Sequence, residues 1–137
     1  MKNRMGTFYT SCRVTNHVDR KKSVEIRKVL VDTGAEFTWI NGEKLKHIGV
    51  KREKKDYRFV MANGQEINRS VGFAIIHVGD ALTIDEVIFG ESGDLEILGA
   101  RSLEGMNLRV DPRAKKLVAG GPILAAGIRW PTRRRRS

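Results

Sequence analysis

The chain contains, once in its 137 residues, the stretch Leu30-Val31-Asp32-Thr33-Gly34-Ala35, in which an apolar strand runs into an Asp-Thr-Gly triplet. An Asp followed by a small polar residue and Gly is also typical of turns and helix caps, so the triplet alone identifies no activity. Two carboxylates about 3 Å apart that share one proton can activate a water molecule. A single triplet supplies one of these carboxylates, so a catalytic interpretation requires two chains.

The residues beside Asp32 fit this catalytic interpretation. Thr33 offers a hydroxyl that can hold the loop in place, and Gly34 allows backbone to approach the carboxylate closely. Ala35 keeps the neighbouring surface small and apolar. Asp32, Thr33 and Gly34 are therefore the candidate catalytic residues.

The composition is that of one basic globular domain. Hydrophobic residues make up 40% of the chain, and 26 Lys and Arg against 16 Asp and Glu give a net charge of +10. Such a charge favours polyanions or acidic partners. Arg129 and the run Arg133–Arg136 carry five of these charges within the last nine residues. A solvated tail is the simpler interpretation of that run, and contact with nucleic acid or an acidic protein is the alternative.

Cysteine usage and hydropathy predict a cytoplasmic protein. Cys12 is the only cysteine, so no disulfide can form within the chain, and a reducing compartment is expected. The first residues do not resemble a secretory signal, and no apolar run of 18 residues predicts a membrane span.

Apolar and polar residues alternate through most of the chain and predict short strands joined by tight turns. The predicted strands cover 8–18, 24–31, 37–40, 57–62, 65–71, 72–78, 82–89, 95–99, 107–110 and 116–118. Short helical turns are expected over 43–48 and 100–106. Asn63-Gly64 is the clearest hairpin turn, because these two residues best tolerate the positive φ angles that a two-residue turn needs.

The order of these motifs resembles that of a retroviral-type (retropepsin-like), single-lobe aspartic protease, especially the small cellular and prokaryotic members. The resemblance covers roughly residues 8–118. It depends on Asp32-Thr33-Gly34-Ala35, on the later Ile97-Leu98-Gly99, and on the hairpin between them. It implies a protease lobe over 1–118 and an extension over 119–137 that is first apolar and then Arg-rich.

The resemblance implies an all-β, mainly antiparallel fold: a closed acid-protease-like β-barrel lobe with one flap hairpin and one or two short helices. Ile97, Leu98 and Gly99 would pack beneath the Asp-Thr-Gly loop and support it. The implied substrate-binding residues are Ala35 and Glu36 beside the triplet, and Ala62, Asn63, Gly64 and Gln65 in the flap.

The implied activity is hydrolysis of a peptide or protein substrate by a homodimer. Two Asp32 carboxylates, one from each chain, would deprotonate a water molecule and protonate the scissile amide, without a metal or another cofactor. Because the two carboxylates titrate as a pair, a bell-shaped pH dependence is expected.

Four further residues bear on this resemblance. Glu36 matches the acidic residue of viral members in charge but is longer, and Arg101 could form an ion pair with it or remain solvated. Phe37 and Trp39 could fill the core or line a substrate pocket.

Other chemistries find less support in the sequence. His17, His47 and His77 are widely spaced and form no two-histidine metal motif, so no metal is expected. Cys12 has no evident catalytic partner, and Gly90–Asp94 lacks the Lys of a phosphate-binding loop. The main alternative is a noncatalytic dimeric binding module of the same fold, which uses Arg133–Arg136 to bind nucleic acid or an acidic protein.

Overall fold

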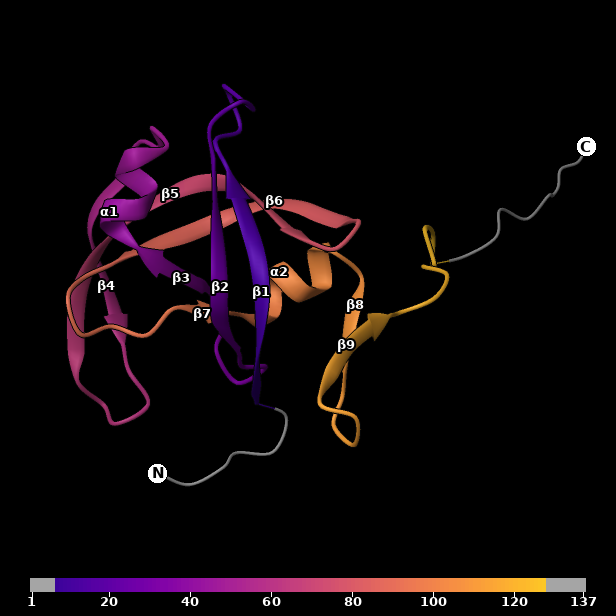
Figure 1. Cartoon of the computed structure of the whole chain (residues 1–137). Helices are drawn as coiled ribbons and strands as arrows, with labels where there is room; N and C mark the ends of the chain where they lie inside the picture. Colours follow the sequence, from indigo (N-terminus) through magenta and orange to yellow (C-terminus); the bar gives the residue numbers. More distant parts are fainter. Residues whose placement is uncertain (1–6, 128–137) are drawn as a thin grey trace, which may run out of the picture.

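A computed structural model describes residues 7–127, and within them the chain is mostly strand with two short helices (Figure 1). This agrees with the sheet-rich class predicted from the alternation. The elements in chain order are β1 (Phe8–Thr15), β2 (Ser23–Val31), β3 (Thr38–Asn41), α1 (Gly42–His47), β4 (Lys54–Val60), β5 (Glu66–Val78), β6 (Ala81–Gly90), β7 (Ile97–Leu98), α2 (Ala100–Gly105), β8 (Leu108–Asp111) and β9 (Lys116–Ala119).

The main sheet has seven strands in the order β1-β2-β7-β3-β6-β5-β4, and β1 also pairs with β5. The pairings therefore lead from β1 through five other strands and back to β1. Most neighbours are antiparallel, but β2 with β7 and β3 with β6 are parallel. β7 thus lies between β2 and β3, the two strands that flank the Asp-Thr-Gly loop.

The long strand β5 replaces two predicted strands. The segments 65–71 and 72–78 were expected to be separate, but the structure has one strand of 13 residues that passes through Gly72. A Cβ at Gly72 would collide with the Lys51 carbonyl oxygen and lie 2.9 Å from Cε1 of Phe89. Gly72 is therefore a site of close packing inside the strand rather than the end of a strand.

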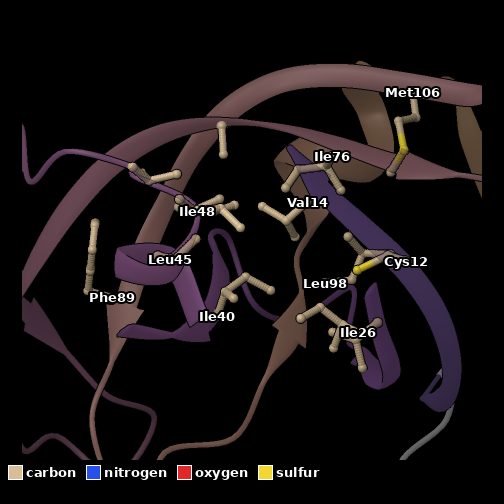
Figure 2. Packing of buried hydrophobic residues seen from close by; sticks show 14 of the residues in the cluster. Cys12, Val14, Ile26, Ile40, Leu45, Ile48, Ile76, Phe89, Leu98 and Met106 are labelled. Carbon is tan, nitrogen blue, oxygen red and sulfur yellow. The ribbon is translucent and has the colours of Figure 1, made fainter. Parts of the chain in front are cut away.

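The core lies between the curved sheet and the helices, and Figure 2 shows its aliphatic packing around Ile40, Ile76 and Leu98. Cys12 is part of this core, with 2% of its surface exposed. Burial raises the pKa of the Cys12 thiol to about 12. The thiol is therefore neutral and packs as a small apolar group.

The helix α1 covers Gly42–His47, close to the helical turn expected over 43–48. Asn41 is its N-cap, and the Asn41 side-chain oxygen accepts hydrogen bonds from the N–H groups of Glu43 at 2.8 Å and Lys44 at 3.2 Å. Both helices of the segment 7–127 are too short to cross a bilayer.

The chain leaves the main sheet through a separate pair of strands, β8 and β9. After β9, Ile123 and Leu124 are 69% and 82% exposed. Arg133–Arg136, for which nucleic-acid contact was considered, lie outside the described residues.

Candidate active site

Asp32 stands directly after β2, and β7 fixes its backbone. The parallel pairing places Val31 opposite Leu98, and the Asp32 N–H donates a hydrogen bond to the Leu98 carbonyl oxygen at 3.1 Å. The residue is 7% exposed. Because Val31 and Leu98 are both fully buried, the carboxylate is carried on a rigid part of the core.

The triplet forms a tight loop around its own carboxylate. The Gly34 N–H donates to Asp32 Oδ1 at 2.9 Å, and the Ala35 N–H donates to the Asp32 carbonyl oxygen at 3.0 Å. A Cβ at Gly34 would lie 3.2 Å from Asp32 Oδ1, which is closer than most side chains allow. The absence of a side chain at Gly34 thus permits the backbone approach that the sequence predicted.

The segment Ile97–Gly99 and the start of α2 lie against the other side of this loop. The Ala100 N–H donates to the Ala35 carbonyl oxygen at 2.7 Å, and the Arg101 N–H donates to the Glu36 carbonyl oxygen at 3.1 Å. A Cβ at Gly99 would collide with the Phe37 carbonyl group. The loop, β7 and the first turn of α2 are therefore joined backbone to backbone.

A buried chain of side-chain hydrogen bonds supports the same corner, and sequence reasoning did not identify it. The Gly99 N–H donates to Thr38 Oγ1 at 3.0 Å, Thr38 Oγ1 is 2.6 Å from Ser102 Oγ, and Ser102 donates to Asp85 Oδ2 at 2.8 Å. Since the Ser102 hydrogen goes to Asp85, the Thr38 hydroxyl donates to Ser102. Thr38 and Ser102 are both fully buried. The only signal in the sequence was a threonine inside an otherwise apolar strand.

Replacement of Ser102 by Ala is expected to lower the free energy of unfolding by about 1–3 kcal/mol, because it leaves the Thr38 hydroxyl and one Asp85 oxygen without their partner. Denaturant unfolding measures this loss. Ser92→Ala, in an exposed turn, is the matched control and should be neutral. Equal stability of the two variants would show that the buried chain contributes nothing.

A groove of about 880 Å³ opens beside Asp32. Its walls are Asp32–Phe37, Phe59–Ala62 and Gly93–Leu95, and Trp39, Ile88 and Ile97 complete the lining. No Lys or Arg lines it within residues 7–127, although the chain carries 26 of them. The groove is large enough for several side chains of a bound peptide, and its surface is aromatic, aliphatic and acidic.

A protein-family model described as gag-polyprotein putative aspartyl protease matches residues 20–105. The chain belongs to this family. Its matched segment is a retropepsin-like aspartic protease domain, which includes Asp32, the β4–β5 hairpin and Ile97–Gly99. A search of curated proteins found no match.

The β4–β5 hairpin of this retropepsin-like domain turns at Asn63-Gly64, as predicted. Gly64 has a φ of 87°, the Gly64 N–H donates to the Met61 carbonyl oxygen at 2.8 Å, and the Gln65 N–H donates to Asn63 Oδ1 at 2.9 Å. Of the proposed substrate-binding residues, Ala35, Glu36 and Ala62 line the groove. Asn63, Gly64 and Gln65 form the hairpin tip and lie outside the groove lining of a single chain.

Aromatic side chains connect the hairpin to the strand after the triplet. The Phe59 ring centroid lies 5.6 Å from that of Phe37 and 5.9 Å from that of Trp39. Trp39 is 7% exposed, packs in a buried cluster with Val71 and Ile88, and also lines the groove. The core and pocket interpretations of Phe37 and Trp39 therefore both apply.

Of the two interpretations of Arg101, the ion pair with Glu36 is not formed. Its guanidinium lies over the Phe37 ring at 4.8 Å, and Arg101 Nη1 is 3.7 Å from Glu86 Oε1. The Glu86 side chain is 21% exposed, so its charge is less screened by water than that of the exposed Glu36. Within residues 7–127, Glu36 forms no ion pair, and it is one of the residues that line the groove.

His77 on β5 lies 3.1 Å from the Thr15 hydroxyl through Nε2, and its pKa is lowered by burial and by the charges of Arg13 and Arg20. In the part of the chain that the structure describes, no three His, Cys, Asp or Glu side chains form a group that could hold a metal ion.

Proposed function

We propose that the protein is a homodimeric aspartic endopeptidase in which the Asp32 carboxylates of two chains activate one water molecule. The observation that carries this proposal is the position of Asp32: it lies at the groove, and its loop is fixed by Leu98 and Gly34. In the mechanism, one carboxylate takes a proton from the water while the other protonates the scissile amide.

A second carboxylate from the same chain does not fit this role. Asp94 is another groove residue, but both of its oxygens accept hydrogen bonds from Arg69, and one also accepts the Glu91 N–H. Glu36 lies four residues past Asp32 on the groove wall, and its backbone is held by α2. A second copy of the Asp32 loop is the simplest source of an equivalent carboxylate.

The exposed side of the triplet loop suits contact with a second chain. Thr33 and Gly34 are exposed, and the Thr33 hydroxyl forms no hydrogen bond with other residues in 7–127. The role of holding the loop, expected for Thr33, is then exerted across the dimer, where its hydroxyl meets the partner chain. The catalytic site is therefore complete only when two chains associate.

The proposed function also assigns roles to the closed sheet and to the β4–β5 hairpin. The return of the strand pairings from β5 to β1 supports a closed barrel within the lobe expected over 1–118, and β9 runs one residue past that boundary, to Ala119. The β4–β5 hairpin is the flap: Ala62–Gln65 would close over bound substrate and exclude water from the groove. Val60, 70% exposed and on the groove wall, would then contact the substrate.

The groove favours a peptide substrate with large apolar side chains, because aromatic residues line it and no Lys or Arg among residues 7–127 does. No metal or cofactor takes part in the proposed mechanism. The paired carboxylates predict a bell-shaped pH dependence of activity.

The experiment is a cleavage assay on denatured protein and peptide libraries, combined with solution mass over a range of protein concentrations. We expect cleavage that increases with the dimer fraction. A dimer that cleaves nothing, and whose binding to nucleic acid weakens and loses its salt dependence when Arg133–Arg136 are removed, would favour the binding-module alternative instead.

A further inference from the structure

The loop between β6 and β7 forms one wall of the groove. Gly93, Asp94 and Leu95 line the groove, and Leu95 is 61% exposed. Gly93 has a φ of 92°, and the Asp94 N–H donates to the Glu91 carbonyl oxygen at 2.9 Å. This wall is thus a compact turn, and its residues pair with no strand in the described part of the chain.

Asp94 ties this turn to the flap strand β5. Arg69 Nε lies 2.7 Å from Asp94 Oδ2, and Arg69 Nη2 lies 3.0 Å from Asp94 Oδ1, so the ion pair is bidentate. The two side chains are 14% and 20% exposed. Asp94 Oδ2 also accepts the Glu91 N–H at 2.7 Å, so one carboxylate closes the turn and anchors it.

Arg69 has little freedom to move away. It stands opposite Tyr57 in the β4–β5 ladder, and Arg69 Nη1 donates to the Asn68 carbonyl oxygen at 2.8 Å. The guanidinium of Arg69 lowers the pKa of the Asp94 carboxyl. The pair therefore stays charged and joined through the neutral range.

A second anchor holds the other side of Leu95. Glu96 Oε1 accepts from Lys44 Nζ at 2.9 Å, and Glu96 Oε2 accepts from the Asn41 N–H at 3.0 Å. Leu95 thus lies between two anchored carboxylates: Asp94 is tied to the flap strand, and Glu96 is tied to the end of β3 and the start of α1.

We propose that Arg69 and Asp94 are positioning residues that hold the Leu95 wall at a fixed distance from the β4–β5 hairpin and so set the width of the substrate groove. Neither residue takes part in the chemistry. Their effect on catalysis depends on the proposed peptidase function, whereas their effect on the wall does not. Arg69 Nη1 also lies 3.5 Å from Glu91 Oε1, but the Glu91 side chain is 66% exposed, so this contact is the weaker tie. Without Asp94 the turn keeps its Glu91–Asp94 backbone bond and this weak contact, and without Arg69 it loses both ties to β5.

The test compares Arg69→Gln and Asp94→Asn with wild type by amide hydrogen exchange and by peptide kinetics. We expect exchange in residues 91–95 to become about tenfold faster. We also expect KM to rise about tenfold while kcat changes by less than about threefold, since binding rather than the chemical step is affected. Arg58→Gln is the matched control, because Arg58 and Glu66 form an exposed ion pair on the same hairpin, 72% and 59% exposed.

Unchanged exchange in residues 91–95 in both variants, relative to Arg58→Gln, would overturn the proposal. The Asp94→Asn variant guards against misfolding, since Asn keeps the shape of Asp and can still accept the Glu91 N–H. If the wild-type protein cleaves no peptide, the proposed function fails, and the exchange measurement still decides whether Arg69 positions the wall.

Discussion

Replacement of Asp32 by Asn is expected to abolish peptide cleavage without unfolding the protein. Asn has the shape of Asp and keeps an oxygen that can accept the Gly34 N–H, but it cannot take up and release a proton. The loss of proton transfer should lower kcat by about 10⁴-fold. Cleavage rates on a peptide substrate and thermal unfolding of the same samples measure the two effects.

Asp80→Asn is the control for the loss of one negative charge, because Asp80 lies in the exposed turn between β5 and β6. It should cleave at the wild-type rate. Comparable rates for the Asp32 and Asp80 variants would rule out Asp32 as the catalytic carboxylate, whatever the fold of the domain.

The largest loss of stability is expected from Gly99→Ala. A Cβ at this position would collide with the Phe37 carbonyl oxygen, and it would lie 2.6 Å from the Phe37 carbonyl carbon and 3.0 Å from the Ala35 carbonyl oxygen. All three atoms are backbone, so no side-chain rotation relieves the clash. We expect the free energy of unfolding to fall by about 3 kcal/mol or more. Activity should fall as well, since α2 must move away from the loop that carries Asp32.

Two other glycines calibrate this effect in denaturant unfolding. Gly105→Ala meets the side chain of Thr83, whose hydroxyl can rotate away but whose Cβ, 2.9 Å from the new atom, must shift slightly. Gly127→Ala meets nothing within 4 Å. The expected order of destabilisation is therefore Gly99, then Gly105, then Gly127. A Gly99→Ala protein as stable as Gly127→Ala would mean that β7 and α2 do not clamp the loop.

Local patterns in the sequence predicted most of the elements. The alternation of apolar and polar residues in 8–18 and 24–31 predicted β1 and β2. The β4–β5 hairpin was predicted at Asn63-Gly64 because a tight turn needs residues that tolerate positive φ. These predictions held because each depends on residues that are close in sequence. The strand boundary predicted at Gly72 was wrong, because the reason for this glycine lies far away in the sequence. The atoms that leave no room for a side chain there belong to Lys51 and Phe89.

The interactions that support Asp32 could not be predicted in the same way. The position of β7 between β2 and β3 pairs Val31 with Leu98, which lies 67 residues later. The alternation of apolar and polar residues along a strand does not show which distant strand it pairs with. The Thr38–Ser102 contact spans 64 residues. Only the resemblance to retropepsin-like proteases suggested that Ile97–Gly99 lies beneath the loop, and it gave no sign that Arg101 prefers Glu86 to Glu36.

The need for Asp32 from two chains in one catalytic site is tested by the activity of wild-type protein mixed with Asp32→Asn protein under conditions that let the subunits exchange. At constant total protein, if mixed dimers are inactive, activity falls with the square of the wild-type fraction, to about one quarter at equal fractions. Mixing with Asp80→Asn should leave activity unchanged. A fall to about one half, in proportion to the wild-type fraction, would show that each chain works alone and would contradict the account.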